Sequence, residues 1–163
     1  MRKLLRVLRR GLACLCVSAV LWAWIFTLVT DASPAQKIVL FANLKEGRWH
    51  ELAAALEKDA PEGIRFVQAH PFSYALMNSD SLRQADLYVM TPAQALEFAD
   101  WIDPEKRMLL YSAGTASGAA VSFLDYAERP GEDWYLYFGV SGLHAGGLDH
   151  AAESVAERLL ALP

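Results

Sequence analysis

The chain has 163 residues, of which 54% are hydrophobic, and a formal net charge of −4. Five of its 15 basic residues precede Gly11, whereas all 19 acidic residues lie at or after Asp31. Residues 31–163 therefore carry a net charge of −9, which argues against nucleic acid as a partner and against anionic lipid head groups as ligands. Both cysteines, Cys14 and Cys16, precede this segment, which excludes disulfides and thiol chemistry from it.

The N-terminal 30 residues combine a basic start, residues 1–10, with an uncharged run of 20 residues, residues 11–30. A helix of that length is about 30 Å long, which matches the hydrocarbon core of a bilayer. The pattern predicts a transmembrane anchor with residues 1–10 in the cytoplasm, because flanking positive charge is retained there. Trp22 and Trp24, near the outer end, favour the membrane interface and hence an uncleaved anchor.

Two other interpretations of residues 11–30 stay open. A cleaved secretory signal has the same basic start and apolar run, although its apolar part is usually shorter. A buried core helix is the third. With an anchor or a cleaved signal, the remainder of the chain lies outside the cytoplasm, either held at the cell membrane by a single-pass anchor or secreted after cleavage. Residues 31–36 are then a spacer, and residues 37–163 form one extracytoplasmic domain.

The first elements of this domain alternate between strand and helix. Residues 37–42 are almost continuously apolar, as expected of a strand buried on both faces. The following apolar residues recur at helical spacing, in a helix that Pro61 and Gly63 end. These are Trp49, Leu52, Ala53 and Leu56.

The alternation continues with strands at residues 64–68, 86–90 and 107–111 and a weaker helical stretch at residues 71–85 that residues 78–81 break or cap. Thr91 and Gln94 form the sequence pattern of a capping box, with a proline between them at the first helical position. The helix that begins there is expected to reach residue 101 or 102.

The chain changes character after residue 112. Residues 121–126 and 134–140 suggest two strands that form an antiparallel pair at the edge of the sheet. Asp149 is expected to cap a last helix. Together these elements predict an α/β fold with three layers: a mostly parallel sheet of about four to six strands, helices on both faces and an antiparallel edge pair.

Ligands of open parallel sheets bind outside the carboxyl ends of the strands, at the point where the strand order reverses. Four polar residues follow the predicted strands and are the candidate ligand-binding residues. They are Asn43, His70, Thr91 and Ser112. Three aromatic residues lie close to them in the sequence as apolar walls: Trp49, Tyr74 and Tyr111. The Thr91 hydroxyl is expected to be occupied by its own helix cap.

Three other patterns could indicate functional sites, but surface or packing roles explain them more simply. The glycines after residue 113 match neither GxxxxGK[ST] nor GxGxxG, so no phosphate loop is predicted. His144, Asp149 and His150 match no zinc spacing, and the two histidines are expected to be solvated, so neither a metal site nor a cofactor is predicted. Ser112, His70 and Asp86 contain the residue types of a hydrolytic triad, but no GxSxG elbow supports it, and the chain is predicted not to be an enzyme.

Three segments resemble the N-terminal lobe of type II extracellular solute-binding proteins. They are Lys37-Ile-Val-Leu-Phe-Ala-Asn43, Ile64-Arg-Phe-Val67 and Ala85-Asp-Leu-Tyr-Val-Met-Thr-Pro-Ala-Gln-Ala95. Residues 134–160 are more loosely similar to the family's return strand, loop and helix. The resemblance implies that Asn43 and Thr91 face a ligand. Members of the family trap their ligand between two lobes, whereas this chain has only residues 111–133 available for a second lobe.

The sequence thus predicts a membrane-anchored, extracytoplasmic binding module that resembles one lobe of a solute-binding protein, with an accessory or sensory role beside a transporter or envelope complex. Its expected partners are the membrane, a small-molecule ligand and a membrane protein. The alternatives are a protein-interaction module that uses residues 134–138 as an edge strand, and an envelope hydrolase.

Overall fold

A computed structural model of the chain describes residues 11, 14–26, 33–73, 79–113, 122–127, 131–144 and 149–162. The chain divides into two compact units, Met1–Ser33 and Pro34–Pro163. Residues 1–10 of the predicted cytoplasmic segment lie outside the described residues.

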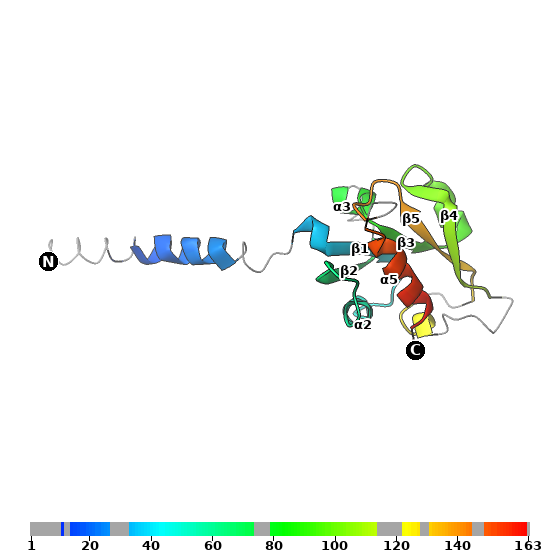
Figure 1. Cartoon of the computed structure of the whole chain (residues 1–163), viewed down its shortest axis with the longest axis horizontal. Coiled ribbons are helices and arrows are strands. Elements are labelled where there is room, and N and C mark those ends of the chain that lie inside the picture. Colours follow the sequence, from blue (N-terminus) through cyan, green and yellow to red (C-terminus); the bar gives the residue numbers. More distant parts are fainter. Residues whose placement is uncertain are drawn as a thin grey trace. The chain divides into compact units, whose positions relative to one another are not determined.

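The N-terminal unit contains an apolar helix over residues 14–26 (Figure 1). Eight large apolar side chains of this helix are at least 42% exposed: Leu15, Val17, Val20, Leu21, Trp22, Trp24, Ile25 and Phe26. Within the described residues, no helix combines the length and the apolar character that crossing a membrane requires. Residues 12–13 and 27–30 of the predicted span lie outside those residues.

The second unit is built on one sheet of five strands in the order β2-β1-β3-β5-β4. The strands are β1 Lys37–Ala42, β2 Phe66–Pro71, β3 Leu87–Met90, β4 Ile102–Tyr111 and β5 Trp134–Gly139. β1 pairs in parallel with both β2 and β3, whereas β5 runs antiparallel to β3 and β4. The predicted α/β class and strand number are therefore confirmed, with a mixed sheet in which only β5 is reversed.

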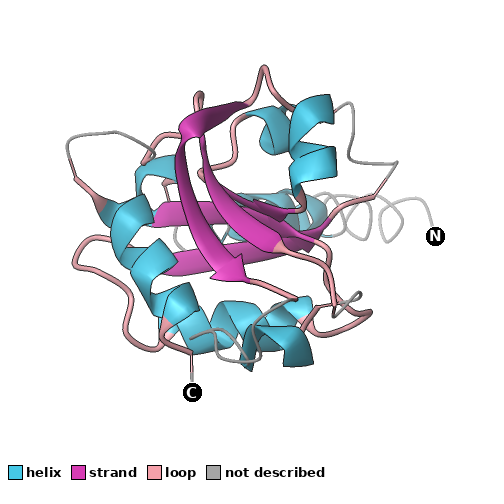
Figure 2. Ribbon diagram, turned by 90° about the vertical axis from the view of Figure 1, so that its right-hand side faces the viewer, coloured by secondary structure: helices cyan, strands magenta, loops and turns pink. Residues whose placement is uncertain are grey.

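Helices cover both faces of the sheet (Figure 2). They are η1 Pro34–Gln36, α2 Trp49–Glu57, α3 Asp80–Arg83, α4 Pro92–Glu97, η2 Ser122–Asp125 and α5 Ala151–Leu160. One core cluster joins Ile38 and Leu40 of β1 to α2, η2 and α5. The second joins Phe41 of β1 to α3 and to residues beside α4. Because successive side chains of a strand point to opposite faces, β1 contributes to both clusters and lies at the centre of the fold.

The predicted strand at residues 121–126 is wrong, because Ser122–Asp125 forms the 3-10 helix η2; residue 121 lies outside the described part of the chain. Phe123 of this turn is buried against Trp134, with ring centroids 5.8 Å apart. A short apolar run packs equally well as a strand or as one helical turn, so its pattern does not separate the two. An antiparallel pair does occupy one edge of the sheet, but its members are β4 and β5.

Some element boundaries also differ from the predictions. α4 ends at Glu97, well before residue 101, and β4 begins earlier than expected, at Ile102. Pro71, the expected start of a helical stretch, is instead the last residue of β2. Of that stretch, α3 is described and Ser79 caps it, while residues 74–78 lie outside the description. Asp149 is not the N-cap of α5, because His150 holds that position with a φ of 49°.

The placement of β5 removes the structural basis for one alternative function. An edge strand was required for the aromatic residues 134–138 to pair with a partner, but β5 already pairs on both sides. The outer strand β2 is protected against such pairing. At β2, Glu57 Oε1 accepts the hydrogen bond of Val67 N at 2.9 Å, and the strand ends in Pro71, which has no N–H. Both features disfavour the addition of a further strand at this edge.

Two glycines allow the segment after β5 to pack against the start of β3. A Cβ atom on Gly139 would lie 2.0 Å from Ala85 O, and one on Gly142 would lie 2.7 Å from Asp86 Cα. Neither backbone neighbour moves without disturbing the sheet. Glycine is therefore required at both positions for close approach.

We expect Gly139→Ala and Gly142→Ala each to lower the free energy of unfolding by about 1–3 kcal/mol, because the added methyl group overpacks this contact. Chemical denaturation of the full-length chain measures the change. Ser141→Ala, between the two glycines, is the matched control and should stay within about 0.5 kcal/mol of wild type. Equal stability of all three variants would contradict the close packing.

Candidate functional site

The carboxyl ends of β1, β2 and β3 meet at one edge of the sheet, because these three strands are parallel. The chain passes from β1 to β2 on one side and then to β3 on the other side of β1. The strand order therefore reverses between β1 and β3, which is the position where open α/β sheets bind ligands. Asn43 and Thr91 directly follow these two strands.

Gln94 joins the two predicted residues. Its side-chain oxygen Oε1 accepts hydrogen bonds from Asn43 Nδ2 at 3.0 Å and from Thr91 N at 3.1 Å. Gln94 N in turn donates to Thr91 Oγ1 at 3.3 Å, which completes the predicted capping box. This network uses the donor end of Asn43 and the acceptor end of Gln94. Asn43 Oδ1 and Gln94 Nε2 take no part in its bonds.

His70 lies one strand away from Asn43, near the end of β2. It pairs with Phe41 across the strands, and the ring centroids of the two residues are 5.2 Å apart. Burial lowers the pKa of His70 below its usual value, so the neutral imidazole is favoured. A hollow of about 350 Å³ extends along β2 and α2 from this point. It is lined by Trp49, His50, Ala53, Ala54, Glu57, Val67, Gln68, Ala69 and His70.

Ser112 is not part of this group. β5 lies between β3 and β4, so the end of β4 is two strand spacings, or about 10 Å, from the end of β3. Ser112 Oγ donates to Asp133 Oδ1 at 2.9 Å, and Ala113 N donates to the same oxygen at 2.8 Å. These bonds fasten the end of β4 to the residue that precedes β5. The structure therefore brings Asn43, Thr91 and His70 to neighbouring strands and gives Ser112 a structural role.

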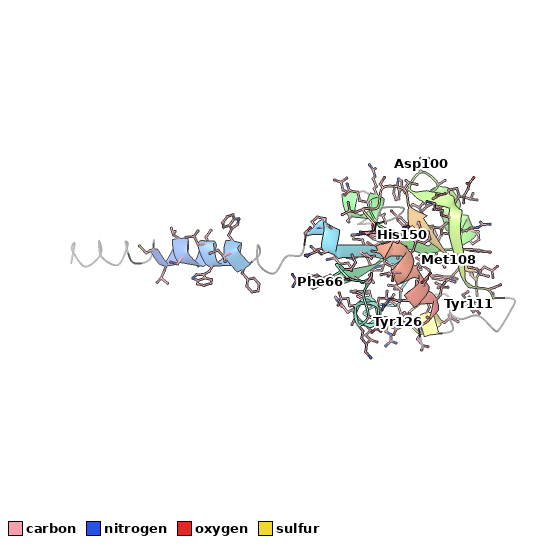
Figure 3. All side chains as sticks on the ribbon, viewed as in Figure 1. Phe66, Asp100, Met108, Tyr111, Tyr126 and His150 are labelled. Carbon is pink, nitrogen blue, oxygen red and sulfur yellow. The ribbon has the colours of Figure 1, made fainter. Side chains whose placement is uncertain are left out.

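Asp86 lies at the opposite edge, before β3, and is only 2% exposed. Figure 3 labels Phe66, the first residue of β2, and Tyr111, the last of β4, near these two edges. Ser112 and His70 lie at strand ends on the carboxyl edge, so the triad with Asp86 is not assembled.

The carboxylate of Asp86 accepts two backbone hydrogen bonds, from Val39 N to Oδ2 at 3.0 Å and from His144 N to Oδ1 at 2.8 Å. Desolvation raises the pKa of the Asp86 carboxyl above its usual value, although both hydrogen bonds oppose the shift. Both oxygens of this buried carboxyl group are therefore satisfied by backbone donors.

His144 was expected at the surface, but only 1% of it is exposed. Its Nδ1 lies 2.6 Å from Asp149 Oδ2, and the ring nitrogen is the donor because a carboxylate only accepts. The expectation failed because His144 N is bonded to Asp86, 58 residues earlier in the chain, and local sequence does not reveal such a contact. His150, by contrast, is exposed at the start of α5.

No group of three or more His, Cys, Asp or Glu residues in the described ranges is arranged to hold a metal ion. The glycine-rich residues 114–120 and 145–148, and Tyr74 among the predicted walls, lie outside those ranges.

Comparisons with protein-family models, with curated proteins and with solved structures found no match for this chain. The similarity to solute-binding proteins therefore rests on the sequence segments that suggested it.

We expect Gln94→Ala to lower the free energy of unfolding by about 1 kcal/mol, because Thr91 N and Asn43 Nδ2 lose their shared acceptor. Gln94→Glu is the matched control, since its carboxylate accepts both bonds and retains the capping box. Thermal or chemical unfolding of the two full-length variants distinguishes them. Equal losses in both would contradict the bridging role of Gln94.

The two carboxyls around His144 predict opposite responses to acid. Desolvation tends to raise the pKa of Asp149, but hydrogen bonds from His144 and Ala151 more than offset it and hold the pKa below its usual value. Asp149 therefore stabilises the fold at neutral pH, and this contribution is lost below about pH 4 as the carboxyl is protonated. The pKa of Asp86 is raised, so its contribution runs the other way: stability increases as the pH falls through that raised pKa towards about 4.

We expect the unfolding free energy of Asp149→Asn to fall less steeply than that of wild type below about pH 4, because the variant has no carboxylate to protonate. Urea unfolding at a series of pH values provides the measurement. Glu132→Gln, at an exposed position remote from His144, is the control. Identical acid profiles for wild type and Asp149→Asn would contradict the contact.

Proposed function

We propose that this chain is a membrane-anchored, extracytoplasmic binding module whose ligand site lies at the carboxyl edge of β1 and β3. Its role is that of an accessory or sensory component beside a transporter or envelope complex. The observation that carries the proposal is the Asn43–Gln94–Thr91 network at the reversal of the strand order. Amide groups held in place by one another are suited to orienting a polar ligand.

Two further features favour ligand binding over catalysis as the function. The polar groups that Asn43, Gln94, Thr91 and His70 bring to this edge are two amides, a hydroxyl engaged in a helix cap and an imidazole. The residue types of a hydrolytic triad, in Ser112, His70 and Asp86, are divided between the two edges of the sheet. The order of β5, a loop and α5 also agrees with the return strand, loop and helix that the resemblance implies.

The anchor is supported by the composition of the N-terminal unit. Large apolar side chains of residues 14–26 are exposed along the helix, and exposed apolar surface of that density is unfavourable in water. The basic residues 1–10 precede it, as in a span whose N-terminus stays in the cytoplasm.

A single lobe supplies one wall of a cleft, whereas small ligands are usually buried on most of their surface. The second wall is therefore expected from another protein in the same complex. The need for a second wall favours a module that works beside a partner over one that captures ligands alone.

We expect a ligand from a panel of amino acids, sugars and short peptides to raise the unfolding temperature of the full-length chain in lipid nanodiscs. At a concentration of about 100 times Kd the stabilisation is about 2.7 kcal/mol, or roughly 5 °C or more. Asn43→Ala should abolish the shift, and Ser112→Ala, outside the site, should retain it. No shift across the panel, or equal loss in both variants, would contradict the proposed site.

We expect the mature protein to retain residues 1–30 and to stay in the membrane fraction after an alkaline carbonate wash. Mass spectrometry of the N-terminus and immunoblotting of the washed membranes give the two measurements. A mature chain that begins after residue 30 and is released by the wash would show a secreted protein instead.

A further inference from the structure

The amino edge of the sheet, opposite the candidate ligand site, carries three of the exposed large apolar side chains of the second unit: Phe66, Val140 and Leu143. The other two described residues of this unit with large, exposed apolar side chains lie elsewhere, Leu96 in α4 and Leu109 near the end of β4. Phe66 is the first residue of β2 and lies opposite Lys37. Val140 and Leu143, exposed by 57% and 58%, follow the end of β5 at the same edge.

The first residues of this unit lie beside the same surface. A hollow of about 300 Å³ at the start of β1 is lined by Pro34, Lys37, Val39, Ser81, Gln84, Asp86, Ser141 and Leu143. Leu143 and Pro34 therefore share one hollow. Its position shows that the chain enters the domain at the amino edge of the sheet, beside Leu143.

The length of chain before Pro34 limits how far this edge can lie from a membrane. The predicted span ends at Thr30, and four residues of extended chain reach at most about 14 Å. The carboxyl edge is separated from Pro34 by the full length of the parallel strands, which is about 20 Å for six residues of β1.

We infer that the amino edge lies on the lipid surface, with Val140 and Leu143 in contact with the bilayer, and that Asn43 and Thr91 consequently face away from it. This inference rests on the membrane anchor of the proposed function. Val140 and Leu143, which follow β5, make the contact, and the parallel strands point outward from the membrane.

The contact is apolar rather than electrostatic. Lys37 and Arg65 lie at this edge, but Glu62 and Asp80 belong to the segments that lead into β2 and β3 there and offset their charge. Anionic lipid should therefore add little to the interaction. Apolar side chains at a membrane interface bind in proportion to the area that they bury, with little dependence on salt.

This orientation has a consequence for the partner that completes the site. A ligand or protein that reaches Asn43 and Thr91 approaches from the side away from the bilayer. The partner's contacting region must then extend beyond the membrane surface by roughly the height of the sheet.

The test places a fluorophore at one edge or the other of the full-length chain. Cys14→Ala and Cys16→Ala provide a background for a single cysteine, at Leu143→Cys or at Asp125→Cys. Asp125 is exposed and lies by Lys45 at the carboxyl edge, since its carbonyl accepts a hydrogen bond from Lys45 Nζ. The protein is reconstituted in phosphatidylcholine nanodiscs that contain a lipid with a spin-labelled head group as quencher.

We expect quenching at position 143 to exceed that at position 125 at least twofold and to change little with added phosphatidylglycerol or salt. Adding Val140→Asp should reduce quenching at position 143 without lowering the unfolding temperature, because that side chain is largely exposed. Equal quenching at both positions in protein that resists the carbonate wash overturns this inference alone. Release of the protein by the wash overturns the anchor and this inference together.

Discussion

The buried carboxylate of Asp86 is the constraint on which the amino edge of the domain depends. Its side chain accepts bonds from Val39 N and His144 N, and its backbone donates to Val39 O and accepts from Gly139 N. One residue thus joins the central strand β1, the start of β3, the end of β5 and the loop that leads to α5. A group with this many buried partners is expensive to replace, because each partner would remain unsatisfied.

The two edges of the sheet are held together by different interactions for this reason. At the amino edge, backbone groups are tied to a single buried charge, and glycines allow the chain to pack without side chains between. At the carboxyl edge, Asn43, Thr91 and Gln94 are held mainly by bonds between side chains and the first turn of α4. Residues on loops above a rigid sheet are the usual carriers of binding function, and the asymmetry of the fold fits that arrangement.

The parts of the fold that depend on neighbouring residues could be predicted from the sequence. Residues 37–42, the apolar stripe of α2 and the capping box at Thr91 each follow from spacing within a few residues. Residues 121–126 were misassigned, because an apolar run of that length suits a strand or a helical turn and only packing on Trp134 decides. The place of β5 between β3 and β4 was equally inaccessible, since strand order is set by pairing across long stretches of chain.

In the site too, local features could be predicted from the sequence and long-range contacts could not. Asn43 and Thr91 were predicted from the strand ends, and topology placed them together. The part of Gln94 in joining them was missed, because its contact with Asn43 spans 51 residues. His144 was assigned to the surface because its local sequence is polar and rich in glycine, and nothing within that loop indicates Asp86 as the group that buries it.

The division between a fixed amino edge and an independent carboxyl edge can be measured by amide hydrogen exchange. In wild type, the amides of Val39, His144 and Gln94 should all be protected. In Asp86→Asn, a side-chain NH2 group replaces one of the two carboxylate oxygens. The backbone N–H of His144 or Val39 then loses its acceptor, so that amide should exchange faster. Gln94, bonded to Thr91 Oγ1, should exchange as in wild type. Equal acceleration at all three amides, or no protection at Val39 and His144 in wild type, would contradict this account.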